Sequence, residues 1–132
     1  LDACLAKAIM SIGAVKGFEI GDGFAVAKMR GSENNDPFRI AEDGSVEKTS
    51  NHSGGILGGM SDGSQIVLRA AFKPTPSISR QQNTVNRSGE NTEIEIHGRH
   101  DPVIVPRAVV VVECMTALTI ADLLLQNRCA KL

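Results

Sequence analysis

One apolar segment near the end of this 132-residue chain limits the folds open to it. Residues 103–112 are rich in valine, and β-branched residues favour a strand. Further on, polar residues recur every three or four positions and leave one narrow polar stripe. The stripe consists of Glu113, Thr116, Thr119, Asp122 and Gln126. This period predicts a helix over residues 106–126, with Pro106 in its first turn.

A helix that is apolar around most of its circumference must be covered on several sides. The strands expected elsewhere in the chain are too few to cover it. The pattern therefore implies that another part of the protein, or another subunit, packs against this helix. The fold class expected is α+β, with an antiparallel sheet packed on buried helices.

The first third of the chain predicts a helix, two strands and a polar excursion. Residues 1–12 show helical periodicity that ends at Gly13. Two apolar runs, residues 15–20 and 24–29, flank the sequence Gly-Asp-Gly, which predicts a hairpin. Residues 31–53 are polar and rich in turn residues, and they are compatible with a small hairpin at positions 43–44.

Two further strands are expected, over residues 65–72 and 92–97. Between them, residues 74–91 show little apolar periodicity, and connections of such length are usually functional or disordered. The chain begins at Leu1, inside a helical pattern with no capping turn before it. We therefore expect it to have been cut on its N-terminal side.

Composition argues against several classes of protein. The 14 Lys and Arg residues nearly balance the 15 Asp and Glu residues, whereas proteins that bind nucleic acids or membrane surfaces need an excess of positive charge. No uninterrupted apolar stretch reaches about 18 residues, so no membrane span is expected. The three cysteines have no close spacing, which is typical of free thiols in a reducing cytosol and favours a cytoplasmic protein.

Two glycine-rich segments could approach a ligand closely. Residues 54–59 contain four glycines, including Gly58, whose backbone N–H groups could cradle a phosphate or flank a flat ring. A pair of tight turns explains these glycines equally well. Residues 13–17 turn from the first helix into a strand, and there Gly13 and Ala14 permit a close approach, although a plain helix C-cap also accounts for Gly13.

A third segment follows the strand of residues 65–72 and combines a lysine with two prolines and two hydroxyls. Its residues are Lys73, Pro74, Thr75, Pro76 and Ser77. Prolines stiffen the backbone, so the ammonium and hydroxyl groups would point in fixed directions. The segment could clamp an anionic cofactor, and an exposed proline-rich turn is the alternative.

The fourth segment, residues 97–102, carries charged side chains beside a helix start. His97, His100 and Asp101 suggest a metal site, but the neighbouring glycine and proline give no regular face, and we expect no metal. Arg99 suits a phosphate or flavin contact, and Asp101 suits a proton acceptor. The alternative is that Asp101 caps the following helix.

Taken together, these segments resemble the chorismate synthase family. The similar stretches follow the family's order through nearly the whole chain: residues 11–24, 30–32, 35–36, 50–59, 72–78, 98–102 and 106–109, and Glu113. The chain departs from the family at four small or apolar positions. Ser53 stands where Ala is usual, Val103 where Cys is usual, Val110 where Pro is common, and Cys114 where Ala is common.

The resemblance implies a carbon–oxygen lyase of the shikimate pathway for aromatic amino acids. The family converts 5-enolpyruvylshikimate 3-phosphate to chorismate and phosphate by an anti-1,4-elimination that requires reduced FMN, and it is also associated with NADP. By resemblance, the FMN contacts are Gly13, Ala14, Gly58, Lys73, Pro74, Thr75, Pro76, Ser77 and Arg99. Asp101 is expected to assist proton removal, and Arg99 can also face the substrate.

The resemblance further implies that residues 1–132 form the C-terminal, FMN-binding half of the enzyme. The chain would supply one layer of a β-α-α-β sandwich, assembled as a homotetramer, and the N-terminal half would be missing. Since that half carries most of the substrate site, we expect the fragment alone to be inactive. Two other hypotheses remain: a structural or assembly domain that binds nothing by itself, and an unrelated phosphate-binding module.

Overall fold

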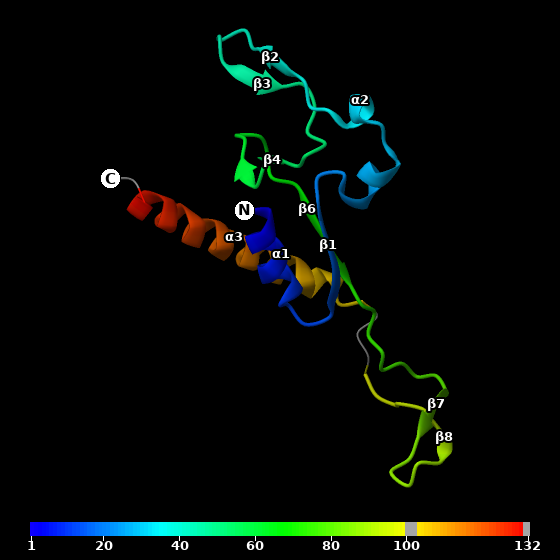
Figure 1. Ribbon diagram of the computed structural model, residues 1–132. Coiled ribbons are helices and arrows are strands. Elements are labelled where there is room, and N and C mark those ends of the chain that lie inside the picture. Colours follow the sequence, from blue (N-terminus) through cyan, green and yellow to red (C-terminus); the bar gives the residue numbers. More distant parts are fainter. Residues whose placement is uncertain (100–102, 131–132) are drawn as a thin grey trace.

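The computed structural model describes residues 1–99 and 103–130 as an elongated α+β arrangement, which confirms the expected class (Figure 1). The central body consists of two helices and a two-stranded ribbon. The helices are α1 (Asp2–Met10) and α3 (Val105–Ala130), and the strands are β1 (Val15–Ile20) and β6 (Leu68–Phe72). Small hairpins extend from this body at its opposite ends.

The antiparallel pairing of β1 with β6 holds the body together. Val15 lies opposite Phe72 and Ile20 opposite Leu68, with a bulge between Val15 and Gly17. The hairpin predicted between residues 15–20 and 24–29 is therefore wrong, because the second run forms the 3₁₀ helix η1 (Gly23–Lys28). The Asp-Gly signal is local, whereas β6 offers β1 an apolar partner from a distant part of the chain.

The buried core is small and centres on α1. Leu5 and Ile9 are completely buried, and Val15, Ile56 and Ala108 are nearly so. Leu5 and Ile9 are four residues apart on one face of α1, which packs against both α3 and β1. Burial of each such side chain contributes about 1.5–3 kcal/mol, so this helix face is the main apolar support of the body.

Helix α3 is confirmed and is longer than predicted, but this chain does not bury it. Of its residues, Ala108 is buried, whereas Leu118 and Leu125 are more than 60% exposed. An 18-residue window of α3 has a mean hydropathy of 2.1, so its length and composition would allow it to cross a membrane. The sequence analysis required an uninterrupted apolar stretch and so did not identify α3 as long and apolar enough to span a membrane, because a few polar residues interrupt it. Core helices of globular proteins pass the same test.

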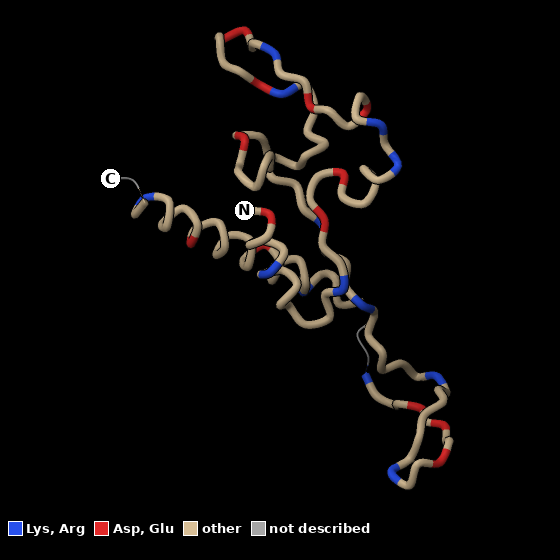
Figure 2. Tube along the Cα trace, in the orientation of Figure 1, with Lys and Arg blue, Asp and Glu red and all other residues tan. Residues whose placement is uncertain are grey.

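The polar excursion contains more regular structure than its sequence suggested. It forms α2 (Gly31–Asn34) and a hairpin of β2 (Phe38–Ile40) and β3 (Val46–Lys48). Gly44, with a φ of 83°, lies in the tight turn, as predicted for positions 43–44. Figure 2 shows many charged residues along this excursion and few along α3.

Two more hairpins complete the fold. β4 (Ile56–Leu57) pairs with β5 (Met60–Ser61), and β7 (Gln82–Val85) pairs with β8 (Asn91–Ile94). Strand β8 confirms the strand expected at residues 92–97, with different bounds. Strand β7 was missed, because its residues are mostly polar and exposed and give no apolar alternation.

The exposed apolar surface of α3 predicts that the isolated segment associates with itself. We expect an oligomer in sedimentation at micromolar concentration and strong binding of a hydrophobic dye. Replacing Leu118 and Leu125 with lysine should weaken both. A wild-type segment that stays monomeric and binds no dye would contradict this expectation.

Candidate functional site

The structure brings together two segments singled out from separate parts of the sequence. The Lys73 backbone N–H donates a hydrogen bond of 2.8 Å to the Ala14 carbonyl, directly beyond the last residues of the β1–β6 ribbon. Ala14 has a φ of 69°, which a non-glycine residue rarely adopts. Among residues 1–99 and 103–130 it is the one non-glycine residue with positive φ. We call this contact the Ala14–Lys73 joint.

The side chains around the Ala14–Lys73 joint are open to solvent. Gly13, Lys73 and Pro74 are exposed, while Thr75 and Ser77 are half-buried. An exposed ammonium beside backbone held in an unusual conformation suits a charged ligand better than a role in packing. This geometry fits an anionic cofactor with a flat ring, because small residues leave the Ala14 side of the joint open.

The fourth predicted segment is only partly described. Arg99 is exposed and lies before the start of α3. The proposed proton acceptor Asp101 lies outside the described residues, as do His100 and Pro102. The hypothesis of a base at Asp101 therefore stays a prediction.

The glycine-rich segment divides into two parts with different roles. Gly54 and Gly55 are buried, and a side chain at Gly54 would meet the Gly21 backbone within 2.6 Å. These two glycines serve close packing within a tight turn, with φ values of 63° and 78°, in keeping with the alternative of tight turns. Gly58 and Gly59 instead form the turn between β4 and β5, with φ values of 57° and 81°.

Gly58 lies away from the Ala14–Lys73 joint. The Leu1 amino group donates a 2.6 Å hydrogen bond to the Gly59 carbonyl, so the turn lies at the start of α1, whereas Ala14 follows its end. Gly58 is exposed, and no atom lies within 4 Å of where its Cβ would be. The structure therefore does not bring Gly58 together with Lys73.

A buried charge cluster was missed by the sequence analysis. The side chains of Lys48, Asp36 and Asp62 are only 3%, 4% and 9% exposed. The Lys48 ammonium lies 2.7 Å from Asp62 Oδ2 and 3.4 Å from Asp36 Oδ2, and it donates to Ser53 Oγ at 2.9 Å and to Asn51 Oδ1 at 3.2 Å. We call these five residues the Lys48 cluster.

The pKa values of the Lys48 cluster reflect both burial and pairing. Burial raises the pKa of Asp36, but hydrogen bonds from the Ser53 N–H, the Ser50 hydroxyl, the His52 N–H and the Ser53 hydroxyl outweigh it and hold the pKa well below its usual range. Burial lowers the pKa of Lys48, whereas its bonds to Asp62 and Asp36 raise it, with a net increase. The hydrogen bond from Lys48 lowers the pKa of Asp62, so all three charges are retained near neutral pH.

Two further polar contacts lie at the far end of β1. His52 Nδ1 lies 2.5 Å from Asp22 Oδ2, and Arg69 Nε lies 2.6 Å from Glu19 Oε1. The hydrogen bond from Arg69, together with that from the Phe24 N–H, lowers the pKa of Glu19. These contacts fix the turn after β1. They belong to the scaffold, because each charged or polar side chain is bound to its partner rather than open to a ligand.

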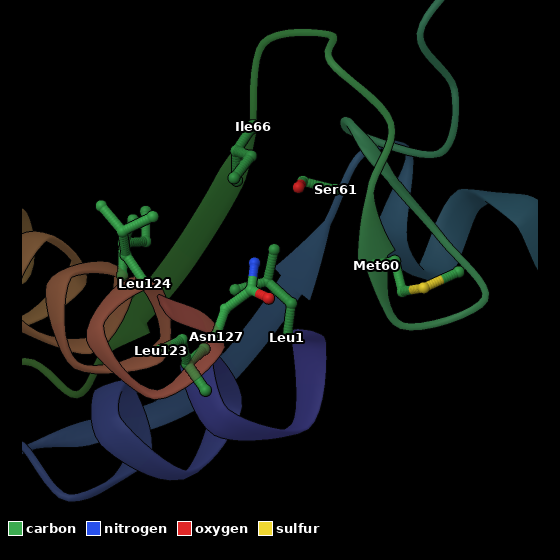
Figure 3. Close-up of a pocket in the computed structure, with 8 residues that line it drawn as sticks. Leu1, Met60, Ser61, Ile66, Leu123, Leu124 and Asn127 are labelled. Carbon is green, nitrogen blue, oxygen red and sulfur yellow. The ribbon is translucent and has the colours of Figure 1, made fainter. Parts of the chain in front are cut away.

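Several hollows follow α3, and two of them are lined mainly by apolar side chains. Figure 3 shows one of about 560 Å³ between the β4–β5 hairpin and the C-terminal half of α3. Its lining residues are Leu1, Met60, Ser61, Ile66, Ile120, Leu123, Leu124 and Asn127. A second, of about 250 Å³, lies between β6 and the start of α3. Because neither lining contains an ionisable side chain, these hollows suit apolar packing rather than chemistry.

Comparison with known proteins places the chain beside one group of enzymes. The family profile described as chorismate synthase matches residues 1–125. The chain is 68% identical over 132 residues to the chorismate synthase of Lachnoclostridium phytofermentans and 59% identical over 128 residues to that of Porphyromonas gingivalis. The first match spans 100% of this chain and 36% of the relative. The second spans 97% of this chain and 35% of the relative.

A solved structure gives the same match in three dimensions. "Crystal Structure of Chorismate Synthase" superimposes with a TM-score of 0.73 at 37% identity. It covers 96% of this chain, whereas the chain covers 30% of that protein. The chain thus spans about a third of the length of the proteins it matches.

The Lys48 cluster predicts a large loss of stability when its cation is removed. In a full-length enzyme carrying this segment, Lys48→Met leaves two buried carboxylates without their partner and should lower the free energy of unfolding by about 3–5 kcal/mol. The control is Arg39→Ala, which breaks the exposed pair with Glu47 and should cost about 0–1 kcal/mol. Urea denaturation measures both, and equal losses would contradict the prediction.

Proposed function

This chain belongs to the chorismate synthase family, and we propose that it forms the C-terminal, FMN-binding part of such an enzyme. The proposed reaction is the anti-1,4-elimination of phosphate from 5-enolpyruvylshikimate 3-phosphate, which gives chorismate. The observation that carries the proposal is the Ala14–Lys73 joint. It unites two of the segments that the resemblance assigns to FMN, although Ala14 and Lys73 lie 59 positions apart in the sequence.

In this proposal, the residues at the joint hold FMN by complementary chemistry. The Lys73 ammonium offers a charge-assisted contact to an anionic group, and the Thr75 and Ser77 hydroxyls offer hydrogen bonds. Gly13 and Ala14 leave room for a flat ring, and Pro74 and Pro76 restrict the backbone between the polar groups. Arg99 provides a second cation. When bound, reduced FMN would lend electron density to the substrate and recover it, with no net redox change.

The proton and the phosphate need groups of their own. We assign Asp101 the role of accepting the proton, because a carboxylate close to the reacting carbon can act as a general base. Arg99 would stabilise the departing phosphate, since a fixed cation favours the negative charge that develops there. Gly58 lies at the other end of α1, so its contact with FMN is a separate part of the proposal and has its own test below.

The remaining partners of the enzyme follow from the uncovered surface. We assign the covering of α3 to the rest of the full-length polypeptide and to other copies in a homotetramer. This assignment is supported by the apolar hollows along α3 and by the 36% share of its relatives that the chain spans. We expect the segment alone to make no chorismate.

The proposal predicts that Lys73→Ala weakens FMN binding in the full-length enzyme. Loss of one charge-assisted contact costs about 1.5–3 kcal/mol, which corresponds to roughly a ten- to hundredfold increase in the dissociation constant. Quenching of flavin fluorescence measures it. Lys28→Ala, an exposed lysine in η1, is the matched control and should bind FMN like the wild type. An unchanged constant for Lys73→Ala would reject this role.

A second prediction concerns the base. Asp101→Asn keeps the size and the capping ability of the side chain but removes its basicity, so single-turnover elimination with pre-reduced FMN should slow about 10²–10⁴-fold. Its melting temperature should not change, because Asn caps a helix about as well as Asp. Near-normal turnover would leave Asp101 as a helix cap.

A further inference from the structure

The β4–β5 hairpin presents an open backbone turn but is too short to hold itself in place. Each strand has two residues, and Gly58 and Gly59 form the turn with φ values of 57° and 81°, the signature of a type I′ turn. Even full-length two-stranded hairpins are marginally stable in water. Groups outside the hairpin must therefore fix its direction.

Two neighbouring residues fix the base of the hairpin. On the incoming side, the Gly55 N–H donates to Asn51 Oδ1 at 2.8 Å. On the outgoing side, the Asp62 N–H donates to the Gly55 carbonyl at 3.1 Å, and the Asp62 carboxylate binds Lys48 Nζ at 2.7 Å. Lys48 also donates to Asn51 Oδ1. One buried ammonium thus connects both sides of the hairpin's base.

The ammonium is itself anchored away from the hairpin. Asp36 accepts backbone N–H bonds from His52 and Ser53, at 2.8 and 3.0 Å, and so holds the polar excursion against the segment that leads into β4. Lys48 ends β3 in that excursion. The backbone of Lys48 is held in β3 and its ammonium is held by Asp36, so the side chain can move little. Asp62 and Asn51, which bind this ammonium, are therefore held in place at the base of the hairpin.

We propose that Lys48, Asn51 and Asp62 are positioning residues that hold the Gly58–Gly59 turn for contact with FMN. The inference rests on the proposed function, because it takes Gly58 as a cofactor contact. None of the three side chains needs to touch the cofactor. They act by keeping two open backbone N–H groups in a fixed place, which lowers the entropy that binding would otherwise cost.

The test uses the full-length enzyme and the Asp62→Ala variant. This change removes the carboxylate link between the outgoing side of the hairpin and Lys48, yet Lys48 keeps Asp36 as its counter-charge. We expect the FMN dissociation constant to rise about tenfold and the kcat at saturating FMN to stay within about twofold. Asp62→Asn, which still accepts a bond from Lys48, should restore binding to within about threefold of the wild type. Ser53→Ala is the control, since it removes a cluster hydroxyl that does not touch the hairpin.

Asn51→Ala provides a second route, because it frees the incoming side while every charge remains paired. It decides the test if Asp62→Ala does not fold, and it should also speed hydrogen exchange at the amides of residues 56–61. A folded Asp62→Ala or Asn51→Ala variant with wild-type FMN affinity overturns the inference. So does Gly58→Ala with wild-type affinity, because the turn then makes no contact. A wild-type enzyme that binds no FMN instead refutes the proposed function itself.

Discussion

The antiparallel pairing of β1 with β6 is the constraint on which the other contacts depend. It fixes the end of α1, because β1 follows that helix after a four-residue turn, and it sets the apolar face of β6 against α3. The same register that aligns Val15 with Phe72 brings the next residues, Ala14 and Lys73, into hydrogen-bond contact. A one-residue shift would turn every side chain of β6 to the other face and would break the joint.

The two ends of this ribbon are stabilised by different physical means. At the end near Ala14, apolar packing of α1 against β1 and α3 sets the geometry, and the charged side chain of Lys73 remains in solvent. At the end near Gly21, close backbone packing with Gly54 leads into the Lys48 cluster, where three buried charges are satisfied by one another and by backbone N–H groups. Such an arrangement costs desolvation energy but defines one geometry, because few other positions would satisfy every group.

Local sequence patterns predicted the parts of this fold that depend on local forces. The helical period after position 112 identified α3 despite the valines before it, and Asp-Gly at positions 43–44 identified the β2–β3 turn. The same dipeptide misled at positions 22–23, because the partner of β1 is distant in sequence. The Lys48 cluster could not be found in this way, since Asp36 and Asp62 lie 12 and 14 residues from Lys48 and their loop reads as exposed. The resemblance assigned both Ala14 and Lys73 to FMN from the order of the motifs. That the two residues lie in contact follows only from the register of β1 and β6, which the sequence did not reveal.

The central claim is that the Ala14–Lys73 joint binds the cofactor of a chorismate synthase. A crystal structure of the full-length enzyme with FMN tests it most directly. We expect FMN to lie within about 4 Å of both the Ala14 backbone and the Lys73 ammonium. A well-ordered FMN that contacts neither residue would contradict it.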